Sequence, residues 1–67
     1  MNEEALTAAV DRFMRSVDLS ARRELEKAMR KGLASGRLQT GVPMTTSITL
    51  SNPQADLDIT IFSKIEL

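Results

Sequence analysis

The spacing of apolar residues changes once along this chain, near Gly41 and Pro43, and that change most constrains the fold. Before it, apolar side chains recur every three or four residues, which is the period of an amphipathic helix. After it, apolar and polar side chains alternate, as they do in a strand with one buried face. An α+β protein is therefore expected, with its helices first and its strands last.

The helical part is predicted to contain two amphipathic helices, over about residues 3–16 and 21–34, with a short link at 16–20. Asn2 and Ser20 are N-cap residue types at the two predicted starts. Gly36 follows the last apolar position and suits the left-handed residue that ends many helices. The predicted apolar faces are formed by Leu6, Val10, Phe13, Met14 and Val17 in the first helix, and by Leu25, Ala28, Met29, Gly32 and Leu33 in the second.

Gly32 lies inside the second predicted helix, where a glycine costs about 1 kcal/mol relative to alanine. Two interpretations follow from the sequence. The glycine permits the close approach of another part of the backbone, or it marks an early end of the helix.

An antiparallel hairpin is predicted after Pro43, with strands over about residues 44–50 and 57–65 and a turn at 51–56. Pairing Leu50 with Leu57 places Ile48 opposite Ile59 and gathers the apolar side chains on one face. The two helices are expected to pack on this face, in one small domain that spans residues 1–67. The expected apolar face consists of Met44, Thr46, Ile48, Leu50, Leu57, Ile59, Ile61, Ile65 and Leu67.

The residue inventory excludes several kinds of catalytic site. The 67 residues include no cysteine and no histidine, so Ser-His-Asp and Cys-His arrangements cannot form. A metal site would lack its usual nitrogen and sulfur ligands. Asp56 and Asp58 are interpreted as surface charge at the start of the second strand rather than as a carboxylate pair. We therefore expect a protein that is not an enzyme and has no cofactor and no metal.

The open edges of the hairpin are the first candidate site. A chain this short buries only about 60% of its unfolded surface, so a partner subunit is a common route to stability. An isolated two-stranded hairpin is also marginal in water. Phe62 points outward from the second strand, with Thr60 and Lys64 beside it, and these three residues are the predicted partner contact. The alternative is a monomer whose edges are protected by Pro43, Asp58 and Lys64.

Basic residues on the second predicted helix are the second candidate site. The formal net charge is zero, yet residues 1–11 are acidic, 12–37 are basic and 38–67 are acidic. This pattern suits charge matching between subunits as well as binding of an external anion. Expected helical ion pairs are Arg22–Glu26, Glu26–Arg30 and Glu24–Lys27, which neutralise part of the basic side. A solvated face is the favoured interpretation, and the candidate nucleic-acid contacts are Arg22, Arg23, Lys27, Arg30, Lys31 and Arg37.

The sequence also resembles a known family. The Met-Asn-Glu start, the run "RELEKAMRKGLASGRL", the strand "TTSITL" and the terminal "KIEL" are similar to those of a family of very short bacterial proteins of unknown function. The resemblance covers nearly the whole chain. It implies a stand-alone α+β domain in a bacterial cytoplasm and carries over no activity and no site.

The functional expectation is a small protein-interaction or regulatory module, homodimeric through the hairpin edge, with weak nucleic-acid binding by the second helix as the alternative. The acidic start is unlike a signal peptide, and no long apolar stretch predicts a membrane span, so a cytoplasmic location is expected.

Overall fold

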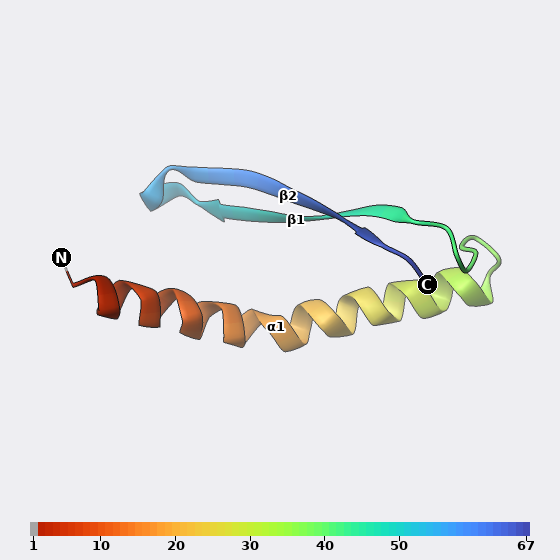
Figure 1. Cartoon of the computed structure of the whole chain (residues 1–67), viewed down its shortest axis with the longest axis horizontal. Coiled ribbons are helices and arrows are strands. Elements are labelled where there is room, and N and C mark those ends of the chain that lie inside the picture. Colours follow the sequence, from red (N-terminus) through yellow and green to blue (C-terminus); the bar gives the residue numbers. More distant parts are fainter. Residues whose placement is uncertain (1) are drawn as a thin grey trace.

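The computed structural model describes residues 2–67 and contains one long helix followed by an antiparallel hairpin (Figure 1). Helix α1 spans Glu3–Ala34, strand β1 spans Met44–Asn52, and strand β2 spans Leu57–Ile65. A single 3-10 turn, η1, spans Pro53–Ala55 and joins the two strands. The predicted α+β class and the C-terminal hairpin are confirmed.

The prediction of two helices is wrong, because α1 continues through residues 16–20. This segment contains no glycine or proline, so nothing in its backbone forces an end. The Ser16 hydroxyl donates to the Phe13 carbonyl (2.8 Å), which is a bond that serine makes inside a helix rather than at a cap. Asp18 accepts from Arg22 four residues later (2.7 Å). The apolar positions also keep helical spacing across the segment, from Met14 and Val17 to Ala21 and Leu25.

The predicted ends of the helical part are confirmed. The Asn2 side chain accepts hydrogen bonds from the backbone N–H groups of Glu4 (2.9 Å) and Ala5 (3.3 Å). At the other end Gly36 has a φ of 77°, and its N–H donates to the Leu33 carbonyl (3.2 Å). Capping at both ends satisfies backbone groups that have no partner within the helix.

We expect replacement of Asn2 by alanine to destabilise the protein by about 1 kcal/mol, because two N–H groups lose their acceptor. The melting temperature, followed by circular dichroism, should fall by about 4–8 °C for a chain of this size. Asn2→Ser is the matched control, since serine also caps helices. Equal stability of both variants and the wild type would refute the role of the cap.

The hairpin pairs in a register that differs from the predicted one by two residues. Leu50 lies opposite Ile59, and Ile48 lies opposite Ile61. The strands extend to Asn52 and Leu57 because Asn52 accepts from the Ala55 N–H (3.2 Å) and so closes a tighter turn than the predicted one. A shift of two residues leaves every side chain on its predicted face.

Gly32 is buried, and its close approach is to the connector that follows the helix. A Cβ atom at this position would lie 2.5 Å from Cγ and Cδ1 of Leu38, while the Leu38 N–H donates to the Gly32 carbonyl (3.0 Å). The helix continues to Ala34, so the interpretation of Gly32 as an early helix end is wrong. The approaching group is a side chain together with its own backbone N–H.

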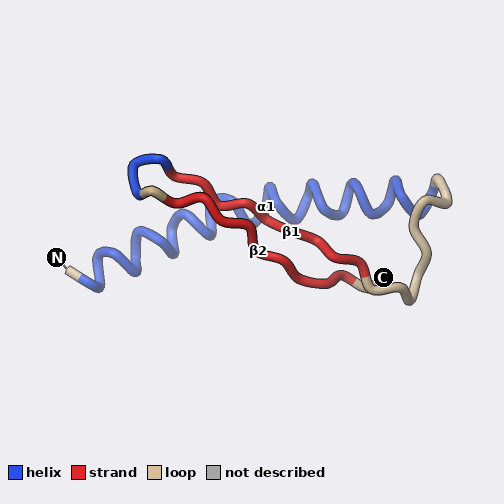
Figure 2. The backbone as a smooth tube through the Cα atoms, turned by 90° about the horizontal axis from the view of Figure 1, so that it is seen from above, coloured by secondary structure: helices blue, strands red, loops and turns tan. Residues whose placement is uncertain are grey.

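The hairpin lies along α1 and crosses it obliquely (Figures 1 and 2). The molecule measures 51 × 21 × 19 Å, and its radius of gyration of 15.8 Å exceeds the value of about 11 Å expected for a compact chain of this length. The predicted packing of the helical part on the apolar face of the hairpin is therefore incomplete. No apolar side chain within residues 2–67 is fully buried. The half-buried ones cluster mainly near the connector and include Leu25, Met29, Leu38, Met44 and Ile65.

Candidate interaction surfaces

Thr60, Phe62 and Lys64 form a row on the outward face of β2, as predicted from their alternation. Phe62 is 66% exposed, which is a high value for an aromatic side chain. Its cross-strand neighbour is the polar residue Ser47. We call these three residues the outward row.

Cross-strand hydrogen bonds hold the two polar members of the outward row. Lys64 Nζ donates to the Thr45 hydroxyl (3.0 Å), and the hydroxyls of Thr60 and Thr49 share a hydrogen bond (3.1 Å). Phe62 therefore stands between two polar neighbours that each form a hydrogen bond to β1. One exposed aromatic ring is thus surrounded by polar side chains. Protein contact surfaces have a similar composition, with aromatic residues at the centre and polar residues at the rim.

An open apolar groove lies between α1 and the tip of the hairpin. It has a volume of about 600 Å³ and is lined by Val10, Phe13 and Met14 from the helix and by Leu50 and Leu57 from the strands. Val10 and Phe13 are about half exposed although they face the hairpin. At this groove the apolar faces of α1 and the hairpin approach each other but do not cover each other. The hydrophobic spacing of these residues predicts that they pack together, but spacing identifies the apolar face of an element and not whether that face is covered.

The basic side of α1 is partly neutralised, but not by all the predicted pairs. Arg22 contacts Asp18 rather than Glu26, and the hydrogen bond and charge of Asp18 raise the pKa of Arg22. The predicted Glu26–Arg30 pair is confirmed (3.2 Å). The Asp18 pairing was missed because residues 16–20 were predicted to lie outside a helix.

Among the described residues, three of the predicted nucleic-acid contacts remain unpaired on one side of the helix. The helix carries Arg23, Lys27 and Lys31 four residues apart, so they share one side. That side lies opposite the one that carries Leu25 and Met29. None of the three forms an ion pair within residues 2–67, so the predicted Glu24–Lys27 pair is absent there. Arg37 lies apart from them, in the connector that follows α1.

Comparison with known proteins identifies the family. A family model described as "Family of unknown function (DUF6494)" matches residues 1–67. The chain belongs to the DUF6494 family. This agrees with the resemblance to a family of short proteins of unknown function. Neither the curated proteins nor the solved structures provide a significant match.

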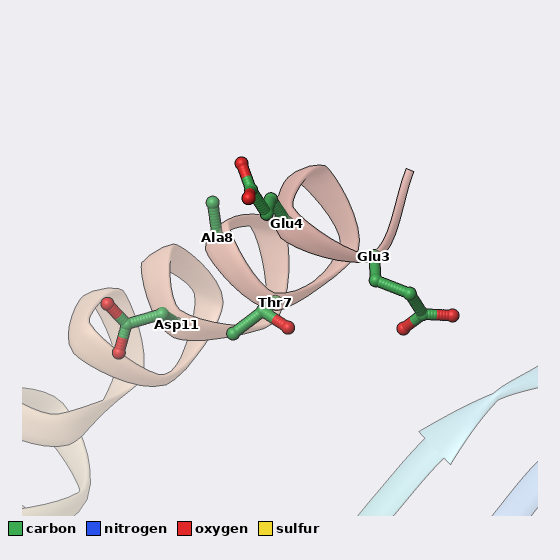
Figure 3. Close-up of a pocket in the computed structure, with 5 residues that line it drawn as sticks. All are labelled: Glu3, Glu4, Thr7, Ala8 and Asp11. Carbon is green, nitrogen blue, oxygen red and sulfur yellow. The ribbon is translucent and has the colours of Figure 1, made fainter. Parts of the chain in front are cut away.

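The acidic start of this DUF6494 chain does not form a convergent site. Glu3, Glu4 and Asp11 lie along the first turns of α1 with Thr7 and Ala8 between them, and their carboxylates point apart (Figure 3). Across residues 2–67, no three acidic side chains are grouped closely enough to hold a metal ion. In the same part of the chain, no helix has both the length and the apolar character needed to cross a membrane.

Proposed function

We propose that this DUF6494 protein is a non-enzymatic protein-interaction or regulatory module, which self-associates through the hairpin edge and presents the outward row to a partner. The single observation that supports this proposal is the exposed Phe62 ring between Thr60 and Lys64. Aromatic residues are enriched at protein interfaces, where one ring often supplies much of the binding energy. The proposal includes a bacterial cytoplasmic location, which the family resemblance implies.

A second candidate function is weak nucleic-acid binding by the basic side of α1. Arg23, Lys27 and Lys31 support it, because they share one side and have no ion-pair partner in the described part of the chain. Binding of phosphates by so few cations is weak and falls steeply with salt. The other three predicted contacts add less, since Arg22 and Arg30 are paired and Arg37 lies in the connector.

Phe62→Lys should reduce capture of protein partners from a lysate of the native cells by about tenfold, because a desolvated aromatic contact contributes about 1–2 kcal/mol or more. Capture is measured by quantitative mass spectrometry with tagged bait. Val42→Lys is the matched control, since Val42 is also an exposed apolar residue but lies in the connector.

The same capture experiment separates the two candidate functions. A nuclease-treated arm removes partners that are held through nucleic acid. If Phe62→Lys captures the same proteins as the wild type, the outward row is not the contact. If all capture disappears with nuclease, the basic side of α1 becomes the favoured surface.

A further inference from the structure

The chain exposes more surface than a compact monomer of its size. Its accessible surface is 5955 Å², whereas a folded monomer of 7.4 kDa is expected to expose about 4,200 Å². The excess is about 1,700 Å² per chain, which lies within the range that each subunit of an obligate dimer buries. The uncovered area is thus sufficient for a second subunit.

Much of the uncovered surface is apolar and lies on the inner faces of α1 and the hairpin. Phe13 is 49% exposed on the helix, and the paired residues Ile48 and Ile61 are 54% and 52% exposed in the middle of the hairpin. A second copy of this chain carries the same apolar faces. Joining two hairpins edge to edge, with their apolar faces on the same side, would place both α1 helices on that side.

The free edge of β2 carries the charges that set a pairing register. Asp58 and Lys64 are the charged residues of β2, and both lie on its outward face. They are six residues apart, about 20 Å along an extended strand, so they do not meet within one chain. Strand β1 contains no charged residue, so pairing of two β1 edges offers no charge match.

One antiparallel register matches these charges across a twofold axis. If the axis passes through Ile61, Asp58 of each chain lies opposite Lys64 of the other, and both pairs form on the outward face. The inner face then pairs Leu57 with Ile65 and Ile61 with itself. A shift of the register by one residue would turn one apolar face toward the opposite side of the sheet.

The same axis gives the two helices a favourable electrostatic arrangement. The middle of β2 and the middle of α1 lie at the same position along the long axis of the molecule (Figure 1). Twofold rotation about that position makes the two helices antiparallel. The acidic start of one helix, with Glu3, Glu4 and Asp11, then lies at the same end as the basic final turns of the other. A four-stranded sheet is about 19 Å wide, which two adjacent helices cover.

We infer that two copies of this chain pair through their β2 edges in the register centred on Ile61, forming a four-stranded sheet covered on its inner face by two antiparallel α1 helices. This inference rests on the self-association part of the proposed function and specifies its geometry. The outward faces of both copies remain accessible, and the two Phe62 rings lie diagonally across the new strand pair. The dimer therefore joins two outward rows into one larger surface.

Charge reversal tests the register. Asp58→Lys places two lysines opposite each other at both ends of the strand pair, and Lys64→Asp does the same with two aspartates. Each single variant should dimerise about tenfold or more weakly than the wild type in sedimentation equilibrium at low salt. The double variant Asp58→Lys/Lys64→Asp restores opposite charges and keeps the net charge of the wild type, so it should dimerise as the wild type does.

An equimolar mixture of the two single variants supplies the decisive measurement. Each variant repels itself, but in a heterodimer every position 58 lies opposite a position 64 of opposite charge, so the mixture should recover wild-type association. The mixture is also informative if each single variant is unfolded because it cannot dimerise. In that case formation of the heterodimer would restore folding. Single variants that dimerise as the wild type does, or a mixture and double variant that both fail to recover, would overturn the register. A wild type that stays monomeric would overturn self-association altogether, whereas capture of partners through Phe62 is tested separately.

Discussion

Leu19→Pro should cost about 3 kcal/mol or more, because proline removes a backbone hydrogen bond in the middle of α1 and clashes with the preceding turn. Leu19 is 54% exposed, so the loss would come from the backbone and not from packing. Because a small domain has only a few kcal/mol of stability, most of the folded population should be lost. The helical signal at 222 nm and the thermal melt measure this effect.

Leu19→Ala is the matched control, since alanine keeps the helical backbone and removes the same exposed side chain. It should change stability by no more than about 0.5 kcal/mol. If two helices met at residues 16–20, proline there would be tolerated and the two variants would behave alike. That outcome would contradict the continuous helix Glu3–Ala34.

Gly32→Val should destabilise the protein by about 1–3 kcal/mol, because the new side chain occupies the space of Leu38. The clash involves Cγ as well as Cδ1 of Leu38, and the backbone of Leu38 is held to the Gly32 carbonyl. The side chain therefore cannot move away without disturbing the connector. The gain in helix propensity of valine over glycine is a few tenths of a kcal/mol and does not offset this cost.

The change is measured as the free energy of unfolding in urea, at one fixed protein concentration because association would contribute to it. Ala28→Val is the matched control on an exposed part of α1 and should cost about 0.5 kcal/mol or less. A double-mutant cycle with Leu38→Ala should show that the two substitutions are not additive, since the smaller residue relieves the clash. Additive effects would mean that Gly32 and Leu38 do not contact each other as described.

The continuity of α1 was present in the sequence, although the two-helix prediction missed it. The apolar spacing passes through residues 16–20 without losing phase, and no glycine or proline interrupts it. Ser16 lies in the predicted link and Ser20 is an N-cap residue type, but serine also occurs inside helices when its hydroxyl bonds to a preceding carbonyl. Uninterrupted apolar spacing is therefore the better guide than an isolated cap residue.

Local chemistry by itself determined the two ends of α1 and the faces of the strands. Asn2 caps the helix and Gly36 ends it because few other residue types satisfy those backbone requirements as well. The outward positions of Thr60, Phe62 and Lys64 follow from the two-residue period of a strand.

The tertiary structure decided three other features. The pairing of Leu50 with Ile59 depends on how tightly Asn52 closes the turn, and the burial of Gly32 depends on where the connector returns Leu38 to the helix. The open groove beside Phe13 depends on how closely the hairpin approaches α1. Hydrophobic spacing reports which side of each helix or strand is apolar. Contacts between residues distant in the sequence determine whether that side is covered. In this protein many of the apolar side chains remain exposed.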